Sequence, residues 1–187
     1  MKKIMIIAAI AFVSVSAMAQ PKFAHVNFSE LVQLMPEMDA AREQSEAASR
    51  EAQETYQAMI EEFQSKYQQY EQKQASWTAA VKQQKEKELG EIQNRIQEFE
   101  AAIQQDMQQL QNQLMAPIYQ KAQETVNTLA KNAGYIYVFD ASQVLYIDSA
   151  QSSDITAAAR KALDIPEDRT IESLQAELQA RAAAAQQ

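Results

Sequence analysis

Apolar residues recur at steps of three and four along residues 37–131, a stretch rich in Gln, Glu, Ala and Lys and almost free of Gly and Pro. On a helix this spacing gathers them into one narrow stripe. The first half of the stretch carries Ala52, Tyr56, Met59, Phe63, Tyr67, Tyr70 and Trp77. The second half carries Leu89, Ile92, Ile96, Phe99, Ile103, Met107, Leu110, Leu114 and Ile118. The pattern predicts two long helices that pack as an antiparallel hairpin.

The hairpin is expected to turn at residues 76–80, because Pro36 and Pro117 lie at nearly equal distances from that segment. A limb of about forty residues, rising about 1.5 Å per residue, extends roughly 60 Å. We therefore predict a coiled-coil arm over residues 37–117. Pro117 is expected to kink the second helix where the arm enters a body. Gly90, inside that helix, is either a flex point or a tolerated surface position.

Shorter segments on both sides of the arm predict the body. Residues 23–28 alternate in polarity like a strand, with Ser29 as the N-cap of a short helix that Pro36 ends. After a helix terminus at Gly134, residues 135–139 and 144–147 predict two strands of a hairpin, and residues 155–163 a helix. The expected fold is α+β and predominantly helical. Its β-rich oligomerisation body is discontinuous, comprising residues 20–36 and 118–165.

The predicted strands after the arm are apolar on both faces, so each face needs a covering layer. A body of roughly sixty to seventy residues with three strands and open edges is marginal as an isolated unit. Self-association would cover the second face and close the edges, so we predict a homo-oligomer. The candidate interface residues are Val26, Phe28, Tyr137, Phe139, Leu145 and Ile147.

The first residues have the layout of a cleaved secretory signal. Lys2 and Lys3 precede an apolar run that is too short for a membrane anchor, and Ala17-Met18-Ala19 forms a small-x-small cleavage site before Gln20. Residues 1–19 are therefore expected to be removed, between Ala19 and Gln20, and the mature chain to work outside the cytoplasm. The alternative is a retained amphipathic or core helix.

Charge and residue content exclude several classes of function. The net charge of −8 disfavours nucleic-acid binding, and the absence of cysteine excludes disulfides and thiol catalysis. His25 is the only histidine, which excludes a multi-histidine metal site, and its position in a predicted strand favours a structural or interface role over a histidine-based triad. With glycine only at positions 90 and 134 there is no phosphate-cradling loop. We expect no enzyme activity, cofactor or metal.

The tip of the arm is locally basic despite the acidic chain. It is either a contact surface, including one for peripheral membrane contact, or a solvated helix face with ordinary lysines. The lysines of this basic tip are Lys66, Lys73, Lys82, Lys85 and Lys87.

The order of these features resembles the Skp/OmpH family of periplasmic chaperones. The resemblance covers about residues 22–165 and rests on a secretory signal, a strand with Val26-Asn27, the Gln-rich hairpin, the predicted strand pair of residues 135–147 and Asp154-Ile155-Thr156 at the start of the last helix. It implies a homotrimer whose small β-rich body carries three helical tentacles around a cavity. It also implies that the cavity holds unfolded outer-membrane β-barrel proteins without ATP, in a Gram-negative periplasm. Residues 166–187 lie beyond the resemblance and predict a short amphipathic helix with a frayed tail.

Amphipathic side chains on the arm are the candidates for binding such clients, because Tyr, Met and Trp adapt to many sequences through weak contacts. The client-binding candidates are Tyr56, Met59, Tyr67, Tyr70 and Trp77. The alternative is that the stripe forms the seam between the two limbs, with Trp77 capping the hairpin. At the level of function, the alternatives are a structural coiled-coil spacer and an adaptor of the cell envelope.

Overall fold

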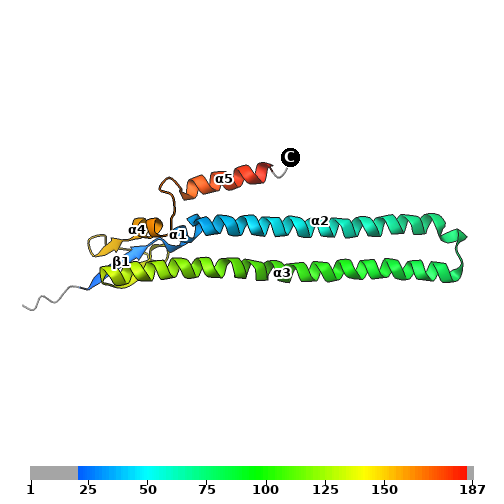
Figure 1. The fold of residues 1–187 in the computed structure, drawn as a ribbon, viewed down its shortest axis with the longest axis horizontal. Coiled ribbons are helices and arrows are strands. Elements are labelled where there is room, and N and C mark those ends of the chain that lie inside the picture. Colours follow the sequence, from blue (N-terminus) through cyan, green and yellow to red (C-terminus); the bar gives the residue numbers. More distant parts are fainter. Residues whose placement is uncertain (1–20, 185–187) are drawn as a thin grey trace, which may run out of the picture.

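The computed structural model describes residues 21–184 and shows a long two-helix arm on a small body (Figure 1). The predicted signal segment, with Ala19 and Gln20, lies outside the described residues. The predicted fold class, helical with a small sheet, is confirmed. In chain order the elements are β1 (Lys22–Val26), α1 (Phe28–Leu34), α2 (Pro36–Lys73), η1 (Gln74–Ser76), α3 (Ala79–Ala133), β2 (Tyr135–Asp140), η2 (Ala141–Gln143), β3 (Ser152–Asp154), α4 (Thr156–Ala162) and α5 (Ile171–Ala184).

The arm is formed by α2 and α3, which run antiparallel and pack along each other (Figure 1). The apolar stripe of α3 buries Ile92 and Ile96 in the seam. The turn lies at residues 74–78, slightly earlier than predicted, because the Thr78 side chain accepts a hydrogen bond from the Val81 amide at 3.4 Å and starts α3 at Ala79. The sequence pattern therefore predicted the hairpin correctly but placed its turn two residues late.

The second limb continues into the body without a break. α3 contains both Gly90 and Pro117, and its residues Ile118, Ala122 and Val126 are part of the body's core. A Cβ atom at Gly90 would meet nothing within 4 Å, so close packing does not require glycine there. The helix ends as predicted at Gly134, whose φ of 73° is the left-handed conformation that glycine adopts without steric cost.

The sheet contains three parallel strands in the order β2-β1-β3. Val26 of β1 pairs with Asp140 of β2, and His25 pairs with Asp154 of β3. The predicted hairpin of residues 135–139 and 144–147 is therefore wrong: residues 144–147 form no strand, and the third strand is Ser152–Asp154. Parallel strands need a crossover, and the apolar segment 144–147 belongs to that crossover. Ser and Asp favour strands little, so no local pattern indicated β3.

The core lies between one face of the sheet and the helices of the body. Leu31 and Leu34 of α1 and Met35, directly after it, are fully buried there with Leu163. Burial of one face of the short α1 supplies most of its stability, since seven residues make too few helical hydrogen bonds to be stable alone. The remaining buried members of the core are Ala24, Val26, Val32, Met38, Ala41, Ile118, Ala122, Val126, Ile155, Ala159, Ile165 and Leu174.

Two of the segments on which the family resemblance rests, Val26-Asn27 and Asp154-Ile155-Thr156, contact each other in the body. Asn27, not Ser29 as predicted, caps α1: its side chain accepts a hydrogen bond from the Glu30 amide at 3.1 Å. The Asn27 amide in turn donates to the Thr156 hydroxyl at 3.1 Å, and the Asp154 carboxylate accepts from the Thr156 amide at 2.8 Å. Ile155 lies in the core. The Asp-Ile-Thr segment thus fastens the start of α4 to the start of α1.

Candidate functional surfaces

The five client-binding candidates lie along the arm and around its tip. Tyr56, Met59, Tyr70 and Trp77 are half-buried, whereas Tyr67 is 45% exposed. The Tyr67 ring stacks on Phe63, with ring centroids 6.1 Å apart. Glu100 of α3 accepts a hydrogen bond from the Tyr56 phenol, and this bond raises the pKa of Tyr56. Four of the five side chains therefore contribute to the seam, and Tyr67 offers the largest exposed face.

The tip is closed by Trp77. Its ring meets the edge of the Tyr70 ring, with centroids 5.9 Å apart and planes at 62°. The Lys82 amine lies 6.0 Å from the centroid of the Tyr70 ring, within the range of a cation–π contact. These contacts correspond to the hairpin-capping alternative, and the part of Trp77 that remains exposed is at the very end of the arm.

The Tyr70 phenol also joins the two limbs, because it donates a hydrogen bond to Glu86 Oε1 at 2.5 Å. This bond, together with the negative charge of Glu86, raises the pKa of Tyr70 to about 12. The neutral phenol is the form that stabilises the fold. Its contribution is complete below the ordinary value near 10 and is lost as the pH rises through about 12.

We therefore expect an ultraviolet titration of tyrosinate to show a late phase near pH 12. Tyr70→Phe should remove one phenol from that phase, and Glu86→Gln should return the Tyr70 transition toward the ordinary range. A Glu86→Gln curve identical to that of the unchanged protein would contradict the Tyr70–Glu86 contact.

The basic tip is less positive than its lysines imply. The Lys85 amine lies 2.9 Å from a Glu88 carboxylate oxygen, and Lys66 approaches the same oxygen at 3.8 Å. The hydrogen bond from Lys85 lowers the pKa of Glu88. Lys87 pairs with Glu91 at 3.6 Å. A charge count over residues 64–87 omits Glu88 and Glu91 because both lie just past the end of that segment. On the helix each of these acids is one turn away from the lysine that it pairs with.

The outer face of the sheet is aromatic. Ala24 and Val26 point into the core, so alternation along β1 directs Phe23 and His25 to the opposite face. There the Phe23 ring lies 6.3 Å from the Tyr137 ring and 6.4 Å from the Phe139 ring, measured between centroids. Tyr137 and Phe139 pair with Phe23 and His25, so alternation along β2 directs both aromatic side chains to this face. We call the surface formed by Phe23, Tyr137, Phe139 and the segment 144–147 the outer face.

Large apolar side chains project from the outer face into solvent. Leu145 is 106% exposed, Tyr146 79% and Tyr137 61%. An open apolar groove of about 330 Å³ lies between Phe23, Phe139 and the segment 144–147. A monomeric protein rarely leaves so many large apolar groups together in water.

The predicted interface residues divide into two groups. Tyr137, Phe139 and Leu145 are exposed on the outer face, and Ile147 is half-buried beside them. Val26, by contrast, is 2% exposed in the core of its own chain, so it has no surface to offer a partner. Phe28 is half-buried against Tyr119, with centroids 6.2 Å apart. Sequence alternation could not separate these groups, since it does not say which face the chain's own helices cover.

The described residues hold no group of three or more His, Cys, Asp or Glu side chains that could bind a metal ion. The His25 Nδ1 atom lies 2.9 Å from the Ser152 hydroxyl, and its Nε2 atom lies 4.0 Å from Asp154. These contacts connect β1 to the short β3 and give His25 a structural role. Within residues 21–184, no helix has the length and apolar character needed to cross a bilayer.

The sequence is similar to those of known proteins. The sequence matches the family described as "Outer membrane protein (OmpH-like)" over residues 22–163. It is similar to the chaperone protein Skp of Photorhabdus luminescens and to that of Photorhabdus laumondii subsp. laumondii. Each is 28% identical over 153 residues, which cover 82% of this chain and 91% of the relative. The resemblance predicted from the sequence is confirmed, and the family match ends before α5.

Proposed function

Because the chain belongs to the OmpH-like family, we propose that it is a periplasmic chaperone that holds unfolded outer-membrane β-barrel proteins without ATP. The observation that carries the proposal is the combination of a long amphipathic arm with a small body whose outer face is apolar and exposed. The relatives named as chaperone protein Skp support it. A spacer or adaptor has no comparable observation in its favour.

The chaperone is proposed to act as a homotrimer. In the single chain, β2 and β3 are the outer strands of the sheet, and Leu145, Tyr137 and Tyr146 stand in water beside them. Further copies of the chain would cover this surface and supply partners for the strand edges. Association through the outer face leaves the arms free, since each arm leaves its body from the helical side of the sheet.

Clients are proposed to be held in the space between the arms by many weak contacts. An unfolded β-barrel protein exposes apolar strands that aggregate unless they are covered. Side chains such as Tyr67, with adaptable polar and apolar parts, can contact different sequences, and several arms act together to raise the overall affinity. Holding of this kind requires no nucleotide. We expect the protein to work in the periplasm, and the predicted secretory signal supports this location.

Suppression of aggregation tests the proposal. A denaturant-unfolded outer-membrane β-barrel is diluted into buffer containing residues 20–187 and no nucleotide, and light scattering is followed. An unrelated acidic coiled coil serves as the control. We expect scattering to be suppressed at near-stoichiometric chaperone, and less so by Tyr67→Ser than by the matched variant Gln68→Ser, which alters an exposed polar neighbour. Scattering no lower than with the coiled coil would contradict holding and favour a spacer or adaptor.

A further inference from the structure

The first limb of the arm is attached to the body through a single extended residue. Met35 has φ −62° and ψ 140°, and it separates the end of α1 from the start of α2 at Pro36. A residue before proline disfavours the helical conformation, so the break is fixed by the sequence. The second limb, α3, has no such break between arm and body. A change in the angle of the arm therefore requires rotation at Met35, which we call the joint, together with a bend of α3, where Pro117 lacks one helical hydrogen bond.

The first turns of α2 hold the body through few contacts of their own. Only Met38 and Ala41 are buried on this helix. Glu37 accepts a hydrogen bond from Lys121 of α3, which lowers the pKa of Glu37. The Glu37–Lys121 contact connects α2 to α3. Across the joint itself, Arg42 of α2 donates one hydrogen bond to the Gln33 carbonyl of α1 at 2.8 Å.

The chain after α4 passes over the joint. Asp164 adopts a left-handed φ of 56°, and the Ile165 amide donates to the Arg160 carbonyl at 2.9 Å, which ends α4 and directs Ile165 into the core. Arg160 pairs with Glu30 of α1 at 2.9 Å, and its guanidinium also donates to the carbonyl oxygens of Pro166 and Arg169. Arg160 thereby fixes the segment 166–169 to α1.

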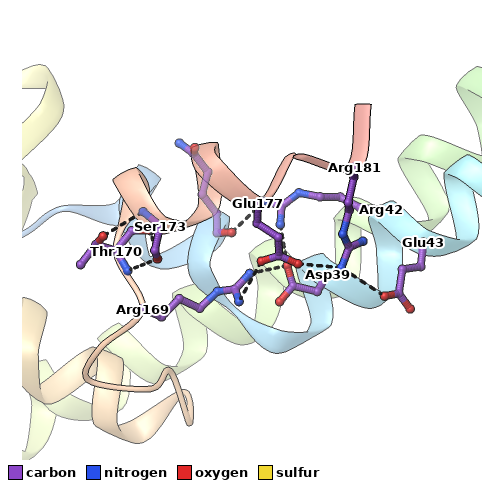
Figure 2. A network of polar contacts seen from close by, with 9 residues as sticks. Asp39, Arg42, Glu43, Arg169, Thr170, Ser173, Glu177 and Arg181 are labelled. Carbon is purple, nitrogen blue, oxygen red and sulfur yellow. Dashed lines mark hydrogen bonds and ion pairs between the residues drawn. The ribbon is translucent and has the colours of Figure 1, made fainter. Parts of the chain in front are cut away.

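The next arginine reaches the other side of the joint. Arg169 donates to Asp39 of α2 at 2.6 Å (Figure 2). The pair is only partly exposed, at 20% for the Arg169 side chain and 30% for Asp39, which makes it less screened than a surface pair. Asp39 also accepts from Arg42 at 2.6 Å. Together, Arg160 and Arg169 connect α1 to α2 through the segment between them.

α5 extends the same connection along α2. Reciprocal hydrogen bonds between Thr170 and Ser173 start the helix, at 2.9 and 3.1 Å (Figure 2). Leu174 is buried in the core, with Ile171 and Leu178 partly buried beside it. Farther out, Arg181 approaches Glu43 of α2 at 3.6 Å. In Figure 1, α5 lies on the side of α2 away from α3.

We propose that residues 166–184 form a clasp across the joint, which fixes the angle at which the arm leaves the body. When the clasp is closed, Arg160, Arg169 and Arg181 hold the first two turns of α2 to the body. When it opens, the arm moves about Met35 with a bend of α3 at Pro117, because the body is then joined to α2 only by one extended residue, the Arg42–Gln33 hydrogen bond and a few apolar contacts. The segment lies outside the 22–163 family match.

A second consequence rests on the proposed function. The width of the space between arms depends on their angle, so the clasp would set the size of client that the chaperone encloses. Closing favours small clients and opening admits large ones.

Amide hydrogen exchange of the mature chain, without any client, tests the clasp. Arg169→Ala is expected to accelerate exchange at residues 36–46 about tenfold, the ratio that corresponds to losing one hydrogen bond between charged groups. Exchange at residues 118–130 of α3 should remain unchanged. The matched control is Arg50→Ala, which removes an exposed arginine of α2 beyond the clasp. Unchanged exchange at residues 36–46 in Arg169→Ala would overturn the proposal.

A covalent lock keeps the test decisive if Arg169→Ala also loosens the body. The chain has no cysteine, so Glu43→Cys with Arg181→Cys supplies the only thiols. Bridging them with a bis-maleimide should slow exchange at residues 36–46 relative to the same protein with separately capped thiols. No difference between the bridged and capped proteins would overturn the clasp. Because no client is present, failure of the holding assay would leave this readout unaffected.

Discussion

Leu34→Ala should lower the free energy of unfolding of the body by about 2–5 kcal/mol. Leu34 ends α1 and is 0% exposed, and it belongs to the core that α1, α3 and α4 form against the sheet. Truncation removes apolar contacts and leaves a cavity that the helices on either side cannot fill without moving. The body is small, so this loss is a large fraction of its stability.

Chemical unfolding followed by circular dichroism, at one fixed protein concentration, measures the effect. Leu110→Ala is the control, because it removes the same atoms from a half-buried position on the arm. A smaller loss is expected there, and if arm and body unfold in separate transitions, only Leu34→Ala should shift that of the body. Equal losses from the two variants would contradict the view that the body has the only densely packed core in the described residues.

Leu145→Asp should abolish self-association while leaving the fold of each chain intact. The Leu145 side chain is 106% exposed, so within one chain the substitution removes almost no contact. In the proposed trimer it would bury a carboxylate among apolar groups of the outer face. A central interface residue of this kind contributes about 2–4 kcal/mol, so the association constant should fall roughly 30- to 1000-fold per interface.

Sedimentation equilibrium over a range of concentrations gives the mass of each variant. Val81→Asp is the matched control, since Val81 is 41% exposed near the tip of the arm and far from the outer face. We expect the unchanged chain and Val81→Asp to associate alike, and Leu145→Asp to sediment as a monomer with unchanged circular dichroism. A monomeric unchanged chain, or an associated Leu145→Asp, would contradict the proposed interface.

The sequence predicted the arm well and the body less well, and the difference has a physical cause. A helix is specified by residues that are close together in the sequence, so the apolar stripe from Leu89 to Ile118 was sufficient to predict one limb of the hairpin. The sheet depends on distant partners: β3 is only Ser152–Asp154 and is a strand because β1 lies beside it. The apolar segment 144–147 looked more like a strand, yet it forms the crossover and most of the exposed surface.

The candidate functional surfaces were also predicted only in part, because they depend on contacts between distant residues. Tyr137, Phe139 and Leu145 are exposed on the outer face, whereas Val26 could not be distinguished from them by type or alternation and is buried. The pairing of Lys85 with Glu88 was missed because the count of tip charges stopped one residue short. The helix of the clasp was predicted, but its contact with α2 had no sequence signal. An arginine at position 169 gives no indication that it meets Asp39, which lies far back in the chain.

The parallel pairing of β1 with β2 also favours one order of folding. The whole arm separates the two strands in the sequence, so bringing them together from an unfolded chain would carry the large entropic cost of closing a very long loop. A helical hairpin formed first returns the chain to its starting point and removes most of that cost, since its base already holds Glu37 beside Lys121. We therefore expect the helical hairpin to form before β1 pairs with β2, and β1 to remain unpaired until then.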